Sequence, residues 1–104
     1  VLKKAIAIVE KNMSNVEFST EQFASEMNMS RSTLHLKMKA VTGESTMDFI
    51  RKIRFGEACK LLKEGRYNVT EISEMVGFNT PSYFATSFKK YMGCLPSEYV
   101  KTGE

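Results

Sequence analysis

Cysteine and histidine are scarce in this sequence, which leaves little from which to build a metal site. The chain has two cysteines, Cys59 and Cys94, without a C-x-x-C spacing, and a single histidine, His35. Zinc sites of the usual kind need several such ligands at short spacings. We therefore expect no metal and no cofactor, and we expect both cysteines to be free thiols in a reducing cytoplasm.

Long apolar runs and helix-breaking residues are also rare. No stretch approaches the roughly 18 uninterrupted apolar residues of a membrane span, so we expect no membrane contact by this segment. Residues 1–12 mix lysines and a glutamate with apolar residues, which excludes a signal peptide. With only two prolines and six glycines in 104 residues, the composition favours an all-α fold with one small core or two very small lobes.

Basic residues are concentrated in the middle of the chain. Residues 31–66 hold nine lysines and arginines against four acids, whereas residues 1–30 and 67–104 each hold three bases and four acids. A basic centre between nearly neutral ends suits a polyanionic partner, although half of these charges are explained equally well by a solvated helix face.

A repeat of about fifty residues organises the chain. Residues 19–24 align with residues 68–73 at an offset of 49, and both segments fit the capping-box pattern at a helix start. The offset becomes 50 further along, pairing Leu34 with Phe84 and Gly43 with Gly93. The change implies one inserted residue in the second copy, which we expect between Asn79 and Phe84.

Each copy has the pattern of a helix, a tight turn and a second helix. The first copy predicts helices over residues 20–27 and 31–41, with Asn28 in the turn and Ser30 as the second N-cap. The second copy predicts a helix over residues 69–76, a turn at Gly77, and a helix that starts near Pro81 and stops at Gly93. The inward side chains expected on the two second helices are Leu34, Met38 and Val41 in the first and Phe84, Phe88 and Tyr91 in the second.

A longer helix is predicted between the copies, over residues 46–63, and an opening helix over residues 1–12. We expect the opening helix to bury Leu2, Ala5, Ile6 and Val9. The middle helix has the inward positions Met47, Ile50, Ile53, Ala58, Leu61 and Leu62, and Gly56 within it suggests a close helix contact. About seven helices result, as a first lobe (1–44), a linker helix (45–65) and a second lobe (66–104). At 1.5 Å per residue the linker helix spans about 27 Å. With part of a lobe at each end, this length suits a protein that places two helices about one turn of DNA apart.

These segments resemble the AraC-type DNA-binding domain of bacterial transcription regulators. Residues 29–45 read MSRSTLHLKMKAVTGES, and residues 69–100 read VTEISEMVGFNTPSYFATSFKKYMGCLPSEYV, which is close to the signature region of that family. The resemblance covers nearly the whole chain. It implies two helix-turn-helix units joined by a linker helix, each of which inserts one helix into the major groove of double-stranded DNA.

The outward faces of the two second helices are the candidates for reading base edges. They carry Ser32, His35, Leu36, Lys39, Ser82 and Thr86. The candidates for phosphate contact are Arg31, Lys37, Arg51, Lys52, Arg54, Lys89 and Lys90. For Arg54 a structural pairing with an acid such as Glu57 or Glu71 is an equal alternative.

Two positions depart from the family pattern, in which arginine is frequent where this chain has Leu36 and Thr86. Arginine pairs with guanine, whereas leucine makes only apolar contact, for instance with a thymine methyl group. We therefore expect the domain to read fewer guanines and to depend more on the shape of the DNA. The missing arginines also motivate an alternative function, a helical protein-interaction module with weak or no DNA binding.

An enzymatic role is not expected. His35 has no acidic neighbour before Glu44 and lies on a short surface helix, so it lacks the partners of a catalytic base. DNA-repair methyl-transfer proteins carry an AraC-like segment, but they need clustered zinc-binding cysteines, which Cys59 and Cys94 cannot supply.

The chain begins on a helix and contains no sensor or receiver domain. We therefore expect the C-terminal output end of a longer cytoplasmic regulator, with the two-component class as one candidate. The resemblance implies RNA polymerase and the N-terminal domains of the same protein as further partners.

Overall fold

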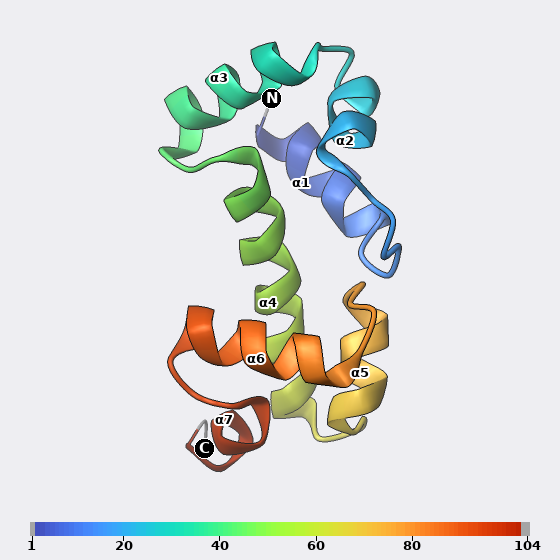
Figure 1. The fold of residues 1–104 in the computed structure, drawn as a ribbon, viewed down its shortest axis with the longest axis vertical. Coiled ribbons are helices and arrows are strands. Elements are labelled where there is room, and N and C mark those ends of the chain that lie inside the picture. Colours follow the sequence, from blue (N-terminus) through green and yellow to red (C-terminus); the bar gives the residue numbers. More distant parts are fainter. Residues whose placement is uncertain (1, 103–104) are drawn as a thin grey trace. The chain divides into compact units, whose positions relative to one another are not determined.

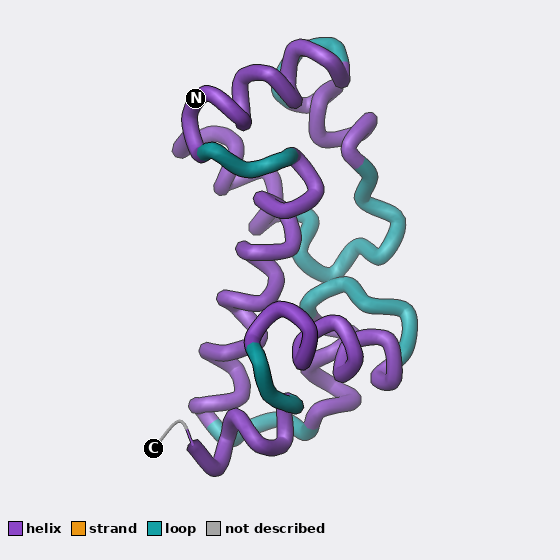
Figure 2. Tube along the Cα trace, turned by 60° about the vertical axis from the view of Figure 1, so that its left-hand side comes forward, coloured by secondary structure: helices purple, strands orange, loops and turns teal. Residues whose placement is uncertain are grey.

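A computed structural model describes residues 2–102 of the chain. Within that range the chain forms helices and loops and contains no strand, which confirms the all-α prediction (Figures 1 and 2). The seven helices are α1 (Leu2–Lys11), α2 (Thr20–Glu26), α3 (Arg31–Thr42), α4 (Thr46–Glu64), α5 (Val69–Met75), α6 (Pro81–Met92) and α7 (Pro96–Thr102).

The chain divides into two compact units, unit 1 (Val1–Ile53) and unit 2 (Arg54–Glu104). The boundary falls inside α4, so the first part of this helix packs in unit 1 and the rest packs in unit 2. Each unit therefore holds a helix pair joined by a tight turn, α2 and α3 in unit 1 and α5 and α6 in unit 2 (Figure 1).

The internal repeat is confirmed in the helix bounds. Helix α5 starts 49 residues after α2, whereas α6 starts 50 residues after α3 and ends 50 residues after it. The two turns match at first, because Met29 N donates to Ala24 O and Phe78 N donates to Ser73 O. The next N-caps are Ser30 and Thr80, at an offset of 50. The inserted residue therefore precedes Thr80, earlier than the sequence alignment placed it.

Local chemistry explains where the second helix of each pair begins and ends. The hydroxyl oxygens of Ser30 and Thr80 each accept a hydrogen bond from a backbone N–H three residues on, at 3.1 Å. The turn before α3 needs a left-handed residue, which Asn28 provides at φ 59°. Gly43 and Gly93 end α3 and α6 with φ of 77° and 90°, the left-handed C-cap that glycine adopts without strain.

The capping boxes at the first helices differ between the copies. Asn68 and Glu71 form the full reciprocal box at the start of α5. At the start of α2 only half of the box exists, because the Ser19 hydroxyl accepts from Gln22 N while the Gln22 side chain bonds elsewhere. The predicted box at Ser19 is therefore wrong in its second half.

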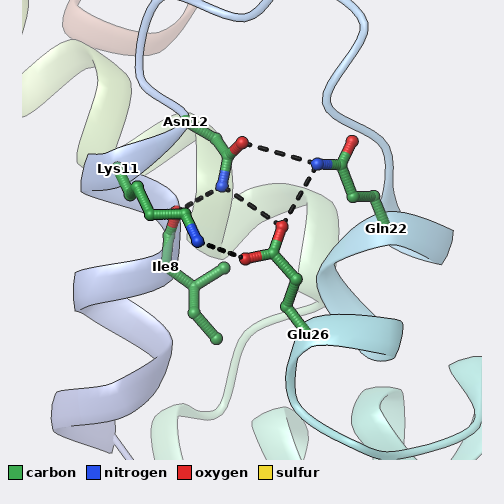
Figure 3. A network of polar contacts seen from close by, with 5 residues as sticks. All are labelled: Ile8, Lys11, Asn12, Gln22 and Glu26. Carbon is green, nitrogen blue, oxygen red and sulfur yellow. Dashed lines mark hydrogen bonds and ion pairs between the residues drawn. The ribbon is translucent and has the colours of Figure 1, made fainter.

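Gln22 instead joins a polar network that ties α2 to the end of α1 (Figure 3). The Glu26 carboxylate lies 3.1 Å from Lys11 Nζ and accepts from Gln22 Nε2 at 3.1 Å. The hydrogen bond from Lys11 makes the largest contribution to lowering the pKa of Glu26 below its ordinary value, and the hydrogen bond from Gln22 makes the next largest. The carboxylate is thus held in its charged form, and the network fixes the first helix of the pair against α1.

The core of unit 1 is a single cluster with Phe23 and Leu34 fully buried. Two predictions about its edges are wrong, because Leu2 and Val41 are exposed, Val41 by 48%. Ile6 is half-buried and packs against the core. Ile8 is buried instead in α1. In α3 the inward stripe continues from Leu34 and Met38 to the half-buried Thr42, so Val41 falls off its side.

The core of unit 2 is built around Phe55, which the sequence analysis did not single out. Its ring lies 5.5 Å from the Phe78 ring, 6.2 Å from Phe84 and 5.7 Å from Phe88, measured between centroids. Tyr91, predicted to be buried, is exposed, although one face of its ring packs 5.1 Å from Phe55. Phe84 and Phe88 are fully buried as predicted.

Two predictions for α4 are wrong. The inward positions of its first turns are Thr46, Phe49 and Ile50, which leaves Met47 on the outside and 56% exposed. Gly56 marks no close helix contact, because a Cβ atom there would meet nothing within 4 Å.

Thr46 contains a buried hydroxyl that costs stability. The residue is 6% exposed, and its Oγ1 atom has no hydrogen-bond partner. The equivalent residue of unit 2 is Pro96, also the first residue of its helix, so the fold does not require a hydroxyl at this position. We expect Thr46→Val to raise the free energy of unfolding by about 1 kcal/mol, because it removes an unsatisfied buried polar group. Urea unfolding followed by circular dichroism measures this change.

Thr42→Val is the matched control in the same unit. The Thr42 hydroxyl donates to Met38 O at 2.8 Å and accepts from Glu44 N at 3.1 Å. The same substitution there should lower the free energy of unfolding by about 1 kcal/mol. Equal signs for the two variants would contradict the assignment of Thr46 as an unsatisfied group.

Candidate nucleic-acid interface

Helices α3 and α6 each turn one face inward and leave the opposite face in solvent. Leu34 and Met38 anchor α3, and Phe84 and Phe88 anchor α6, all four fully buried. The six side chains predicted to read base edges are all exposed on these two helices: Ser32, His35, Leu36, Lys39, Ser82 and Thr86. Both helices therefore offer an outward face for a groove, which is what such a role requires.

The two outward faces share a common register. At the offset of 50 residues, Ser32 corresponds to Ser82, Leu36 to Thr86, and Lys39 to Lys89. The first and last of these positions are chemically identical in the two units, and the middle position differs. The two outward faces also differ at His35, which corresponds to Ala85.

Six of the seven basic side chains predicted to contact phosphate fall into two groups. Lys37, Lys89 and Lys90 are exposed on α3 and α6. Three others form ion pairs: Arg31 with Glu21 at 3.1 Å, Arg51 with Asp48 at 3.2 Å, and Lys52 with Glu44 at 3.4 Å. These pairs lie at partly exposed sites, where an ion pair contributes only about 0–1 kcal/mol and exchanges readily.

Arg54 differs from the other basic candidates. It is half-buried, and its Nη1 atom donates to Gly77 O, the carbonyl of the turn between α5 and α6, at 3.1 Å. Burial lowers the pKa of its guanidinium. The contact holds the turn that positions α6, which supports a structural role for Arg54 in which the Gly77 carbonyl is one partner.

A hollow of about 590 Å³ lies beside the outward face of α3. Leu36 is 69% exposed and lines it together with Met47, so two apolar side chains face solvent next to the polar positions of α3. The full lining is Thr20, Arg31, Ser32, His35, Leu36, Ser45, Thr46 and Met47. The hollow thus lies between the outward face of α3 and the first turn of α4. Sequence analysis missed this connection because it placed Met47 in the core.

Tyr83 is a second candidate that sequence analysis missed. It lies on the first turn of α6, next to Ser82, and is 59% exposed. Its ring lies 5.5 Å from the Phe78 ring, which restricts the side chain while leaving much of it in solvent. A phenol hydroxyl donates and accepts hydrogen bonds and suits a phosphate or a base edge. The repeat could have pointed to Tyr83, since it corresponds at the offset of 50 to Thr33, which is exposed on α3 next to Ser32.

The remaining chemistry of residues 2–102 is limited. This part of the chain has no group of three or more histidine, cysteine, aspartate or glutamate residues placed to hold a metal ion. Cys59 and Cys94 are free thiols and half-buried. None of the helices in residues 2–102 combines the length and the apolar character needed to cross a bilayer.

Comparison with known proteins places this arrangement in a family. The family model of the helix-turn-helix domain matches residues 23–102. A protein named histidine kinase P4 from Formosa agariphila is 42% identical over 99 residues, which is 95% of this chain and 7% of that protein. The chain spans less than a third of the length of the first curated relatives that it matches.

Solved structures agree with the family. The C-terminal domain of AraT, a response regulator from Geobacillus stearothermophilus, is similar with a TM-score of 0.88 and 34% identity, over 97% of this chain and 84% of that one. The DNA-binding domain of AdpA, solved in complex with a target DNA, is similar with a TM-score of 0.86 and 25% identity, over 97% of this chain and 90% of that one. The chain therefore belongs to the AraC-type helix-turn-helix family, the DNA-binding domains of transcription regulators.

Proposed function

We propose that this domain binds a bipartite site in double-stranded DNA, with α3 and α6 in successive major grooves. One observation carries the proposal: the repeat builds two capped helices with buried anchors and outward faces in the same register. A groove-reading helix needs a rigid inner side and a polar or basic outer side, and both units supply these. The alternative of a protein-interaction module is not favoured, because the family is one of DNA-binding domains.

The residue roles in this proposal follow the contacts. Base edges are read by the outward positions of α3 and α6, with Leu36 making apolar contact in unit 1. Lysines on the flanks neutralise phosphates. Arg51 and Lys52, each paired with a nearby acid, exchange that acid for phosphate, whereas Arg54 supports the turn before α6.

The longer protein is proposed to be a cytoplasmic regulator in which this domain is the output end. Its relatives include a protein named as a histidine kinase and a response regulator whose C-terminal domain has this fold. We infer that a phosphorylation signal received elsewhere in the protein controls DNA binding. A further relative is named as a transcriptional activator, and we propose RNA polymerase as the partner that activation would engage.

Salt titration tests the DNA-binding proposal. We expect Lys37→Gln in unit 1 and Lys89→Gln in unit 2 each to reduce the slope of log affinity against log salt by about 0.9, since each removes one phosphate contact. Fluorescence anisotropy with a selected duplex at several salt concentrations measures the slope. Lys3→Gln, which removes the same charge from the exposed face of α1, should leave the slope unchanged. Binding that is indifferent to salt, or equal slopes for all four proteins, would contradict the proposal.

A further inference from the structure

An exposed ion pair joins the two helices of the helix-turn-helix in unit 1. Arg31 is the first residue of α3, and its Nη1 atom lies 3.1 Å from Oε1 of Glu21 in the first turn of α2. The two side chains are 66% and 76% exposed. Such a pair contributes about 0–1 kcal/mol in water, so the guanidinium can leave its carboxylate for another oxyanion at small cost.

The position of Arg31 puts this pair at the reading face. Arg31 lines the hollow beside α3 together with Ser32 and Leu36. When a helix lies in the major groove, its N-terminal residues lie closest to the DNA. A phosphate presents oxygens in the geometry that a guanidinium binds with two parallel hydrogen bonds. The carboxylate of Glu21 and a DNA phosphate would therefore compete for the same group.

The second unit shows that the fold does not need this pair. The residues equivalent to Glu21 and Arg31 are Thr70 and Pro81, neither of which is charged. Unit 2 nevertheless forms the same helix, turn and helix, with a side-chain N-cap at the start of each helix. The ion pair is thus an addition specific to unit 1.

We propose that Glu21 is a competing carboxylate, which holds Arg31 in the free domain and is displaced from it by a backbone phosphate of the DNA. The inference rests on the proposed function, because it assigns what Arg31 exchanges within the same interface. Displacing the carboxylate from Arg31 costs the free energy of that ion pair each time the domain binds. Glu21 therefore lowers the affinity of unit 1 for any duplex and makes binding less dependent on salt than its bases alone would.

Substitution of Glu21 in the 104-residue chain tests this role. Glu21→Gln keeps the shape of the side chain and removes its charge. We expect the affinity for a selected duplex to rise about 3- to 5-fold at low salt, a change on the scale of one exposed ion pair. The salt slope should steepen by up to about 0.9, because binding by the freed Arg31 then releases a counterion without restoring a free acid. Glu21→Asp, which keeps the charge, should retain most of the wild-type slope.

Two controls separate competition from a general charge effect. Glu17→Gln makes the same change of net charge at an exposed residue of the preceding loop and should alter affinity less than 2-fold. In an Arg31→Gln background, Glu21→Gln should lose most of its gain. Thermal unfolding should be nearly the same for wild type and Glu21→Gln, which tests whether Glu21 serves instead to stabilise the start of α2.

The outcomes that overturn the inference are distinct from failure of the proposed function. Equal gains for Glu21→Gln and Glu17→Gln, or a gain that persists without Arg31, would overturn the competition and leave DNA binding intact. A wild-type chain that shows no salt-dependent binding to duplex DNA would remove the proposed function, and this inference would fall with it.

Discussion

Phe55→Ala is expected to lower the free energy of unfolding of unit 2 by about 3–5 kcal/mol, the usual cost of removing a buried phenylalanine ring. Phe55 is fully buried and touches the rings of both α6 anchors, Phe84 and Phe88. Its loss leaves a cavity that neighbouring side chains fill only partly. A loss of this size approaches the whole stability of a small unit, so α6 should lose its fixed position and unit 2 its part in DNA binding.

Denaturant unfolding and amide NMR spectra measure this effect separately in the two units. Because the core of unit 1 contains no residue beyond Ile53, its amide signals should persist in Phe55→Ala. Met47→Ala removes an exposed side chain from the same helix and should cost less than about 1 kcal/mol. A cost below 1 kcal/mol for Phe55→Ala, or simultaneous loss of both sets of signals, would contradict this account of the cores.

Leu36→Arg is expected to give unit 1 a new preference for guanine. Leu36 lies in the middle of the outward face of α3 and is 69% exposed, so an arginine fits there without repacking the core. A bidentate pair between arginine and guanine O6 and N7 discriminates against other bases by about 1–3 kcal/mol. That corresponds to roughly 5- to 150-fold in affinity at one position of the site.

Selection of bound duplexes from a randomised pool, for wild type and variant, measures this preference. Val41→Arg adds the same charge to the exposed C-terminal part of α3, about 140° around the helix from Leu36. It should change affinity for all sequences alike and introduce no guanine. If Leu36→Arg and Val41→Arg select the same sequences, the outward face of α3 does not read bases at position 36.

Much of the fold was predictable because it depends on local chemistry. Ser30, Asn28 and the two C-cap glycines act within one helical turn, so their roles can be read from neighbouring residues. Because the sequence repeats, each assignment made in the first unit could also be made at the equivalent residue of the second unit. The single inserted residue was also detected, although its exact place required the backbone hydrogen bonds of the two turns.

The wrong predictions concern side chains whose burial depends on tertiary packing and not on neighbouring residues in the sequence. Helical spacing could not show that Phe49 and Phe55 lie on the inward side of α4 and that Met47 lies outside. The helix has apolar residues on several of its sides, so the pattern fits more than one inward direction. Val41 was misplaced because the inward side of α3 continues through Thr42, and Tyr91 packs against Phe55 but stays exposed. The pairing of Arg31 with Glu21 joins two helices, and no sequence pattern predicted it.

Hydroxyl-radical footprinting on a selected duplex tests the central claim most directly. Two units that each place one helix in successive major grooves should protect two segments about 10 base pairs apart on one face of the DNA. Substitution of Lys39 or Lys89 should weaken one segment each. Protection of a single segment, with both substitutions acting on it, would contradict the bipartite reading of DNA by α3 and α6.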